Sequence, residues 1–222
     1  MALIVNIDTA TETAHVSIAE DGKILHSLIN DVQKDHAAFL QPALEQLIKN
    51  TGIGFSDIDA VAFTAGPGSY TGLRVGMASA KGLCYALNKP LIAISTLKVM
   101  AKAAVEQGDD SSVLFCPMID ARRMEVFTAI YNNALTEVLP PCALVLDENS
   151  YFNYLQKNKI VFFGNGMQKW RATIQNNHAL FTQVINLPVA LAALSYEYFQ
   201  KTEFADLAYA EPFYIKEFIS NM

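Results

Sequence analysis

One stretch of sequence decides the fold, and it reads Ala62-Phe63-Thr64-Ala65-Gly66-Pro67-Gly68-Ser69-Tyr70-Thr71-Gly72-Leu73-Arg74-Val75-Gly76-Met77-Ala78-Ser79-Ala80-Lys81-Gly82-Leu83. An apolar run typical of a β-strand ends at Ala65, a Gly-Pro-Gly turn follows, and the composition becomes helical from about Ser69. Glycines let another backbone or an anion come close, and a helix N-terminus offers N–H groups to an anion. The stretch predicts a strand, a turn and a helix, with either a plain capped turn or an anion pocket between them.

The turn departs from the common loops that bind phosphate. Leu73 and Arg74 follow Gly72 where a Walker loop has Lys and then Ser or Thr, and the three glycines miss the dinucleotide spacing by one position. The sequence Gly68-Ser69-Tyr70 also lacks the pattern of a hydrolase nucleophile elbow. The motif itself therefore names no known phosphate or acyl chemistry.

The predicted helix over residues 70–87 carries unusually little charge. At 100° per residue its small residues Gly72, Gly76 and Ala80 share one side with Leu83, and its only charges, Arg74 and Lys81, share the other. Surface helices normally have a broader polar face. We therefore expect its flanks to be covered by the chain's own second domain or by another chain; these flanks comprise Leu73, Met77, Cys84, Val75, Ala78 and Tyr85.

The whole chain has the composition of a folded protein. It has 222 residues, 52% of them hydrophobic, and a mean hydropathy of +0.21, enough for one large or two small domains with a core. No apolar run reaches the roughly 20 residues of a membrane span, and no basic region precedes the N-terminal apolar run. We expect a cytoplasmic protein that does not bind membranes.

Charge and cysteine usage exclude several classes of protein. The net charge is −6, and no Lys/Arg cluster exceeds the pair Arg122-Arg123, so the footprint of an autonomous nucleic-acid binder is missing. Any RNA served by this chain should be held by something else. The three cysteines are far apart and form no C-x-x-C pair, which argues against a disulfide framework and against a zinc ribbon.

The first half of the chain predicts the order βββαβαβα over residues 1–107. The expected strands are Leu3–Ile7, His15–Ala19, Ile24–Ile29, Ile58–Ala65 and Pro90–Ile94. A first helix should follow Asp35 as its cap and kink or start late at Pro42. A third helix should be capped by Ser95 or Thr96 and end near Glu106. The core stripe expected on the first helix is Ala37, Leu40, Leu44, Leu47 and Ile48.

The second half, residues 108–222, is predicted to be a degenerate repeat of the first. After the linker-like residues 108–112, strands are expected at Val113–Ile119, Met124–Tyr131, Ala143–Leu146 and Ile160–Phe163. A helix capped by Asp147 or Ser150 should run to Lys157, and another should run from Pro188 to about Gln200. Asp8 and Asp120 then end equivalent strands. The sequence predicts an α/β fold of two lobes, each with a mixed sheet.

Five segments together resemble the TsaB family, also called YeaZ-like. They are Ile7-Asp8-Thr9-Ala10-Thr11, Gly66-Pro67-Gly68-Ser69-Tyr70-Thr71-Gly72-Leu73-Arg74, Ser95-Thr96-Leu97, Ile119-Asp120-Ala121-Arg122-Arg123 and Pro212-Phe213-Tyr214-Ile215-Lys216. The resemblance covers essentially the whole chain in order and spacing. It implies the actin-like ATPase (ASKHA, ribonuclease H-like) fold. Older descriptions of such sequences read glycoprotease or peptidase M22.

The resemblance also implies a function and partners. Members serve the formation of N6-threonylcarbamoyladenosine at position 37 of tRNAs that read codons beginning with A. The implied role is a non-catalytic subunit that binds the catalytic TsaD subunit, reaches the ATPase TsaE through that complex, and forms a homodimer when alone. No cofactor is expected on this chain alone, since ATP and metal belong to the partner subunits, and tRNA is contacted only indirectly.

Few residues of this chain are candidates for catalysis, metal binding or nucleotide binding. The catalytic sister family has two histidines four residues apart after the fifth strand, where this chain has Ser95-Thr96-Leu97-Lys98-Val99. The four histidines form no i, i+4 pair, so no metal site and no catalytic residue is expected. The vestigial nucleotide-binding candidates are Asp8, Thr9, Gly66, Gly68 and Asp120. For the two aspartates the alternative is that each caps its own turn or, for Asp120, pairs with Arg122 or Arg123.

The partner surface is expected on the first two helices. On the wheel Phe39 lies about 160° from Ala37, so Phe39 should face outward beside His36 and Ala43 as an aromatic anchor. The second helix would contribute its small and uncovered residues. The complete expected interface is His36, Phe39, Ala43, Gly72, Arg74, Val75, Met77, Ala78, Lys81 and Tyr85.

Two other functions compete with this reading. A stand-alone ATPase or phosphotransferase of the same superfamily would use Asp8, Asp120 and the turn from Gly66 to Gly72. A metalloprotease has no ligand set in this sequence. If the chain is a partner subunit, it should bind free ATP weakly or not at all, because the turn lacks a lysine for the phosphates. The isolated chain should also not bind tRNA tightly.

Overall fold

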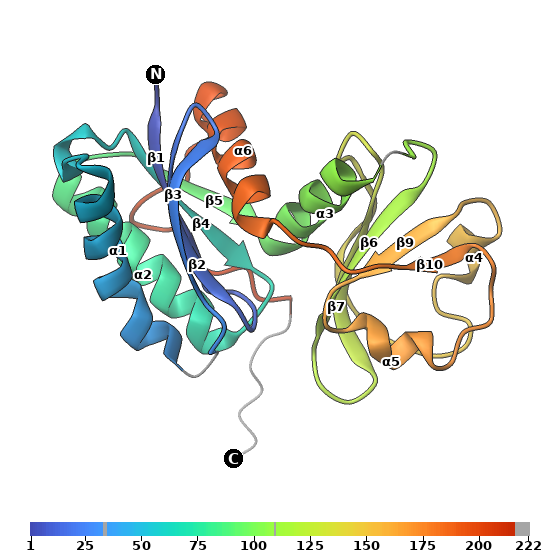
Figure 1. Cartoon of the computed structure of the whole chain (residues 1–222). Coiled ribbons are helices and arrows are strands. Elements are labelled where there is room, and N and C mark those ends of the chain that lie inside the picture. Colours follow the sequence, from blue (N-terminus) through green and yellow to red (C-terminus); the bar gives the residue numbers. More distant parts are fainter. Residues whose placement is uncertain (33–34, 109, 216–222) are drawn as a thin grey trace, which may run out of the picture. The chain divides into compact units, whose positions relative to one another are not determined.

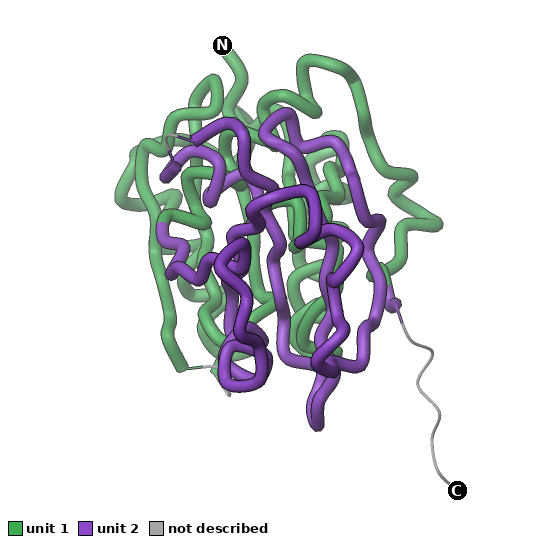
Figure 2. Tube along the Cα trace, turned by 90° about the vertical axis from the view of Figure 1, so that its right-hand side faces the viewer, with its two compact units in different colours: residues 1–99, 186–213 green, residues 100–185, 214–222 purple. Residues whose placement is uncertain are grey.

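A computed structural model describes residues 1–32, 35–108 and 110–215, and the chain forms two compact units. Unit 1 comprises Met1–Val99 and Asn186–Phe213, and unit 2 comprises Met100–Ile185 with Tyr214 and Ile215 of the described C-terminus. Figure 2 shows the two units in different colours. The chain therefore enters unit 2 in the middle of one helix and returns to unit 1 afterwards.

Unit 1 is built on a five-stranded mixed sheet in the order β3-β2-β1-β4-β5. The first three strands are antiparallel and β1 pairs in parallel with β4, which pairs in parallel with β5. Apolar runs form the central strands because both faces of these strands are covered. The strands are β1 (Leu3–Asp8), β2 (Ala14–Glu20), β3 (Lys23–Asn30), β4 (Ala60–Gly66) and β5 (Leu91–Ser95).

Helices cover both faces of this sheet. Helix α1 (His36–Thr51) and helix α2 (Tyr70–Leu87) lie side by side on one face, and α6 (Leu187–Gln200) packs on the other against β1, β2, β3 and β5 (Figure 1). A short 3-10 turn, η2 (Phe55–Asp57), leads into β4. The core beneath α1 and α2 is apolar, with Leu40, Leu47, Val61 and Phe63 fully buried.

Unit 2 repeats the sheet of unit 1 strand for strand, in the order β10-β9-β6-β7-β8. Again the first three strands in sequence are antiparallel and the next two are parallel to the first. Edge strand β8 tolerates two prolines because an edge strand needs fewer backbone donors. The strands are β6 (Leu114–Asp120), β7 (Glu125–Tyr131), β8 (Glu137–Val145), β9 (Ile160–Phe163) and β10 (Ala179–Phe181).

The helices of unit 2 are much shorter than those of unit 1. Helix α4 (Phe152–Leu155) and helix α5 (Met167–Arg171) stand where unit 1 has α1 and α2, and α3 (Thr96–Gln107) runs from unit 1 into unit 2. An aromatic core replaces long helices: Trp170, Tyr151 and Phe162 form a cluster with ring centroids 4.7–5.1 Å apart. This cluster anchors the two short helices to the sheet.

The predicted α/β class and the repeated order of strands are confirmed, and the units divide the chain differently from residues 1–107 and 108–222. The helix that follows β10 packs on the sheet of unit 1, and residues 201–213 stay with it. Elements too short to show a period were missed, namely α5, β10 and η2. Within the described ranges, no helix is both long and apolar enough to cross a membrane.

Candidate functional site

Asp8 lies at the end of β1, and its carboxylate is almost completely buried. Its Oδ1 accepts hydrogen bonds from Thr64 Oγ1 at 2.7 Å and from the Ala10 amide at 2.9 Å. His15 on the neighbouring strand places Nδ1 3.8 Å from Oδ2. Burial lowers the pKa of His15, although the nearby Asp8 opposes that shift. The expectation that Asp8 caps its own turn is confirmed.

The glycine turn after β4 receives the chain's own backbone. A Cβ added at Gly68 would overlap the carbonyl of Ala10, and one added at Gly72 would overlap the carbonyl of Thr9. Thr9 Oγ1 donates to the Gly72 carbonyl at 2.7 Å, and the Ser69 amide donates to the Ala10 carbonyl at 2.7 Å. The space that these two glycines leave is therefore filled by the backbone of the loop after β1.

The start of α2 is capped by its own residues. Ser69 Oγ accepts a hydrogen bond from the Gly72 amide at 3.3 Å, and the Ser69 carbonyl accepts one from the Leu73 amide at 2.8 Å. The Leu73 bond is the first regular bond of the helix, whereas the amides of Gly72 and Ser69, the latter bonded to the Ala10 carbonyl, are N–H groups that a helix start would otherwise offer to an anion. Gly66, in a left-handed conformation with φ +118°, packs against the Phe213 carbonyl.

Asp120 ends the first strand of unit 2, as Asp8 does in unit 1. The two side chains point to different faces of their sheets. Asp8 lies on the face that holds Thr64, whereas Asp120 lies on the same face as Met118, toward the short helix α5. Lys169 Nζ donates to Asp120 Oδ1 at 2.8 Å, and the Arg122 amide donates at 2.6 Å. The pairing partner is therefore Lys169, in place of the guanidinium groups considered from the sequence.

The ion pair sets the protonation of Asp120. Partial burial raises its pKa, but hydrogen bonds from Lys169 and from the Arg122 amide outweigh that effect and hold the pKa below its usual value. The Asn165 side chain in turn accepts a hydrogen bond from the Asp120 amide at 2.8 Å. Both strand-end carboxylates are thus engaged by groups of their own unit.

A row of exposed residues runs along the outer side of α2. It consists of Arg74, Ala78, Gly82 and Tyr85, spaced by four, four and three residues, and we name it the α2 stripe. Tyr85 is 83% exposed, and the Arg74 guanidinium lies over the Tyr70 ring, 4.0 Å from its centroid. Between these two side chains the stripe is made of small residues and leaves the helix backbone accessible.

The chain itself covers part of the flanks of α2, whereas the flank residues Ala78 and Tyr85 are exposed. Val75 and Met77 are half-buried against the core of unit 1, and Gly72 is buried. Lys81 Nζ donates to the carbonyls of Ala208 and Ala210, at 3.2 and 3.1 Å, and so holds residues 201–213 against the helix. We call residues 201–213 the strap. The expectation was that the second domain or another chain covers these flanks; on the strap side the cover comes from unit 1 itself.

The predicted core stripe of α1 is confirmed at Leu40, Leu44 and Leu47, but the predicted outward side is wrong. His36 and Ala43 are buried, Phe39 is half-buried against the core, and Ala37 is exposed. His36 is drawn inward because its Nε2 makes a 2.9 Å hydrogen bond with the Thr11 carbonyl. The buried side of α1 therefore takes in His36 and Ala43 in place of Ala37, a shift of the stripe's centre by less than one residue step of about 100°. Phe39 and its two neighbours do not form an outward ridge.

The helix-cap predictions are right in position, but the expected side-chain bonds are absent. Asp35 occupies the cap position of α1 without a side-chain hydrogen bond, and α1 starts at His36 and continues through Pro42, so the late start is not found. Helix α3 starts at Thr96 as predicted, and the hydroxyl groups of Ser95 and Thr96 have no hydrogen-bond partner among the described residues. Among the described residues, no group of three or more His, Cys, Asp or Glu side chains could hold a metal ion.

Two features of unit 1 were missed in the sequence. The His36 contact to the loop after β1 joins residues far apart in sequence, and the strap has no periodic pattern that could announce its path. The amides of Ala205 and Phe213 donate to the carbonyls of Leu91 and Ala65 at 2.8 and 2.6 Å. The segment Pro212-Phe213-Tyr214, quoted for its family resemblance, is the only signal that could have marked the strap's end.

Comparison with known proteins gives consistent relatives. The family model described as TsaD, tRNA N6-adenosine threonylcarbamoyltransferase, matches residues 26–218. The tRNA threonylcarbamoyladenosine biosynthesis protein TsaB of Haemophilus influenzae is 39% identical over 122 residues, which are 54% of this chain and 50% of that protein. The TsaB protein of Bacillus subtilis is 27% identical over 176 residues, 78% of this chain and 75% of that protein. The first alignment thus spans only half of its relative.

Solved structures agree on the fold. YeaZ from Pseudomonas aeruginosa has a TM-score of 0.79 and 24% identity, with 96% of this chain and all of that chain covered. A polyphosphate/ATP-glucomannokinase from Arthrobacter sp. strain KM has a TM-score of 0.51 and 11% identity, with 89% and 99% covered. The two mixed sheets and their helices form an actin-like ATPase fold, as expected.

Proposed function

Since the chain belongs to the TsaD family of tRNA N6-adenosine threonylcarbamoyltransferases, and within it to the TsaB or YeaZ-like branch, we propose that it is a non-catalytic subunit in tRNA threonylcarbamoyladenosine biosynthesis. In this role it binds and supports the catalytic subunit TsaD. The family model and the names of the relatives support the pathway. The surface for the partner is argued from unit 1.

The observation that carries the proposal is the α2 stripe. A helix face with Ala78 and Gly82 at its centre allows the backbone of a second helix to come close. Tyr85 offers a large exposed ring at one end, and tyrosine is common among residues that dominate binding energy. Lys81 and the strap fix one side of α2, so the stripe is presented on a supported element.

Helix α1 extends this surface. Gln41 Nε2 donates to Ser79 Oγ at 2.8 Å and ties α1 to α2, and the exposed residues Ala38 and Pro42 adjoin that contact. Two helices side by side can form a four-helix bundle with two helices of a partner. The same arrangement permits a homodimer when the chain is alone.

The alternative of a stand-alone ATPase finds little support in the residues it needs. The Gly68 and Gly72 positions are filled by the carbonyls of Ala10 and Thr9, and the Asp8 carboxylate is already hydrogen-bonded at Oδ1. Asp120 is paired with Lys169. Under the proposal, ATP and metal chemistry belong to TsaD and TsaE, tRNA is reached only through the complex, and the work is done in the cytoplasm.

Reconstitution tests this function. Purified TsaD, a source of threonylcarbamoyl-adenylate, TsaE, ATP, Mg²⁺ and unmodified tRNA are combined with and without this chain, and the modified nucleoside is quantified. We expect product only when the chain is present, and no ATP turnover by the chain alone. A parallel titration of the isolated chain with Mg-ATP should give a dissociation constant weaker than roughly 10 μM, about −7 kcal/mol.

Two results would contradict the proposal. Full tRNA modification without the chain would remove the need for it. ATP hydrolysis at ordinary enzyme rates by the chain alone, lost on changing Asp8 to Asn, would favour the independent ATPase.

A further inference from the structure

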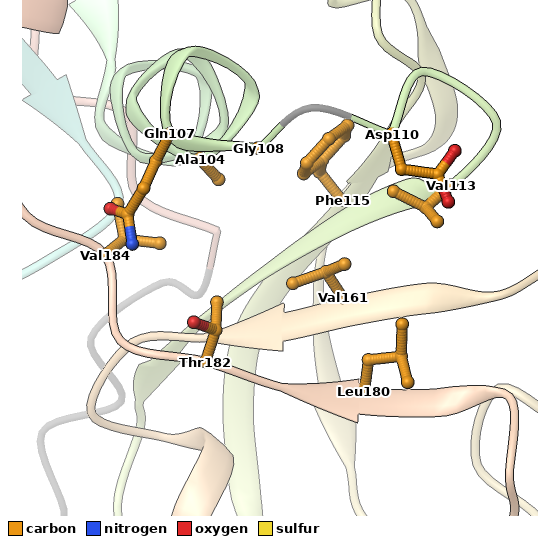
Figure 3. Close-up of a pocket in the computed structure, with 10 residues that line it drawn as sticks. All are labelled: Ala104, Gln107, Gly108, Asp110, Val113, Phe115, Val161, Leu180, Thr182 and Val184. Atoms are coloured by element: carbon orange, nitrogen blue, oxygen red, sulfur yellow. The ribbon is translucent and has the colours of Figure 1, made fainter.

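Unit 2 contains a cavity of about 300 Å³ that none of the proposed functions uses. Its floor is formed by Phe115, Val161 and Leu180, which lie in register on three adjacent strands, β6, β9 and β10, and so share one face of the sheet (Figure 3). The last turn of α3, at Ala104 and Gln107, forms one wall. This volume lies at the lower end of the range for small-ligand pockets.

The cavity exists because α3 covers its sheet less completely than α6 covers the sheet of unit 1. Helix α6 packs along four strands of unit 1, whereas α3 ends at Gln107, above the start of β6. The apolar floor therefore remains partly open: Leu180 is 39% exposed, while Phe115 at the bottom is only 2% exposed. The open floor is apolar and its rim is polar.

The walls of the cavity are fixed by hydrogen bonds. Gln107 Nε2 donates to the Gln183 carbonyl at 2.9 Å, and Gln107 Oε1 accepts from the Ile185 amide at 3.2 Å. Both ends of this side-chain amide are thus used to join α3 to residues 182–185. Thr182 and Val184 complete that wall. Because hydrogen bonds already hold these walls in place, little free energy is lost in ordering them when a ligand binds.

The rim carries negative charge. Asp110 lines the mouth, and its carboxylate accepts hydrogen bonds from Ser112 Oγ at 2.5 Å and from the Ser112 amide at 2.9 Å. These bonds lower its pKa, and Lys159 adds a smaller effect in the same direction. The C-terminal end of α3 reaches the same cavity and contributes a partial negative charge. Apolar walls with a negative mouth select an apolar group that carries a cation.

We propose that this cavity of unit 2 is a binding site for a small organic cation, a primary amine or guanidinium attached to an aromatic or branched aliphatic group. The apolar group rests on Phe115, Val161 and Leu180, and the cationic head lies at the mouth beside Asp110. Lys159 limits the strength of this attraction, because its positive charge already interacts with the Asp110 carboxylate. The site is separate from the α2 stripe, so its failure leaves the proposed function unchanged.

A matched series of three probes tests the site. Phenethylammonium, 2-phenylethanol and 3-phenylpropionate share one ring and differ in charge, and each is titrated into the nitrogen-15-labelled full chain. We expect the amide signals of Val113, Val161 and Leu180 to shift. The cation should bind about two- to fivefold more tightly than the alcohol, as exposed ion pairs contribute weakly, and the anion should bind weakest.

Variants separate the two parts of the site. Asp110→Asn should make the cation and the alcohol bind equally. Val161→Phe should fill the cavity and abolish binding of all three probes, whereas Val145→Phe, on exposed edge strand β8, should leave binding unchanged. If Val161→Phe does not fold, Leu180→Phe at the partly exposed end of the floor serves the same purpose.

Three outcomes would overturn the proposal. The first is no shift at Val113, Val161 and Leu180 with millimolar cation. The second is equal binding of cation, alcohol and anion to the unaltered chain. The third is binding that survives in a folded variant with the cavity filled.

Discussion

Units 1 and 2 share one order of strands and differ in the helices that cover them. In unit 1 the segments between β3 and β4 and between β4 and β5 form helices of 16 and 18 residues, and in unit 2 the corresponding helices have four and five residues. Unit 1 gains a long outer helix with an exposed stripe. In unit 2 the aromatic cluster of Trp170, Tyr151 and Phe162 covers one face of the sheet, and part of the other face is open as a cavity.

The comparison separates the architecture that both units share from what unit 1 adds to it. Both units have a glycine of positive φ where their fourth strand ends: Gly66 is the last residue of β4, with φ +118°, and Gly164 directly follows β9, with φ +97°. A Cβ at Gly164 would overlap the Met118 carbonyl, as one at Gly72 would overlap the Thr9 carbonyl. The glycine turn is therefore part of the shared architecture, and the long helix after it is the addition that belongs to unit 1.

The largest expected effect comes from the cluster that replaces long helices in unit 2. Trp170 is fully buried and its Nε1 donates to the Asp147 carbonyl at 3.0 Å. Trp170→Ala should lower the free energy of unfolding of unit 2 by about 3–5 kcal/mol, because a large cavity and an unpaired carbonyl remain. Amide hydrogen exchange should show lost protection in β6 and β9. A loss below about 1 kcal/mol would mean that other contacts hold the short helices.

The two strand-end carboxylates should respond differently to removal. Asp8→Ala leaves the Thr64 hydroxyl and the Ala10 amide buried without their acceptor, and should cost about 2–3 kcal/mol. Asp120→Ala breaks a partly exposed pair with Lys169 and should cost less than about 1 kcal/mol. Denaturant unfolding followed by circular dichroism measures both. Equal losses would remove the distinction between a buried cap and a surface pair.

Two glycines of the same helix should change stability in opposite directions. Gly72→Ala forces a methyl group into the Thr9 carbonyl and should destabilise the fold by about 1–3 kcal/mol. Gly82→Ala meets no atom within 4 Å and should stabilise the helix by roughly 0.5–1 kcal/mol. Thermal melting of both variants beside the unaltered chain gives the signs. If both stabilise, α2 does not pack closely on the loop after β1.

The smallest effect concerns pH and the buried His15. Burial lowers the pKa of His15 in the folded state, so the unfolded state binds the extra proton more readily. The free energy of unfolding is therefore unaffected by His15 above the unfolded pKa of about 6.5, and it falls as the pH drops below that value. His15→Gln should flatten this part of the profile. The relevant facing charge is Asp8, and an unchanged profile between pH 7 and pH 5 would exclude the mechanism.

Most strands were predictable because their apolar runs are continuous and end at turn residues, whereas the three-residue β10 was missed. Leu3–Ile7 was expected and Leu3–Asp8 is found, and Ile160–Phe163 agrees at both ends. The core stripe of α1 was predictable at Leu40, Leu44 and Leu47, but the burial of His36 was not, since it depends on a contact to Thr11, 25 residues away in sequence. A period in the sequence fixes the centre of a buried stripe, but a single tertiary contact can add a residue at its border.

The candidate site was predicted in part. Arg74, Ala78 and Tyr85 are exposed on one side of α2, and their role with a partner stays a prediction. His36 and Ala43 are buried and leave that surface. The strap that binds Lys81 has no helix or strand pattern, so nothing in the local sequence could show that it covers a flank of α2. The cavity of unit 2 arises from where α3 ends relative to the sheet, which no single segment encodes.

The affinity of the chain for TsaD, measured by calorimetry for the unaltered protein and for Ala78→Glu, tests the central claim most directly. Ala134→Glu, at an exposed turn of unit 2, is the matched control. We expect Ala78→Glu to weaken binding by several kcal/mol, because the interface would bury an unpaired carboxylate, with unchanged melting of the free chain and full affinity in the control. Equal affinities of all three proteins for TsaD would contradict the assignment of the α2 stripe.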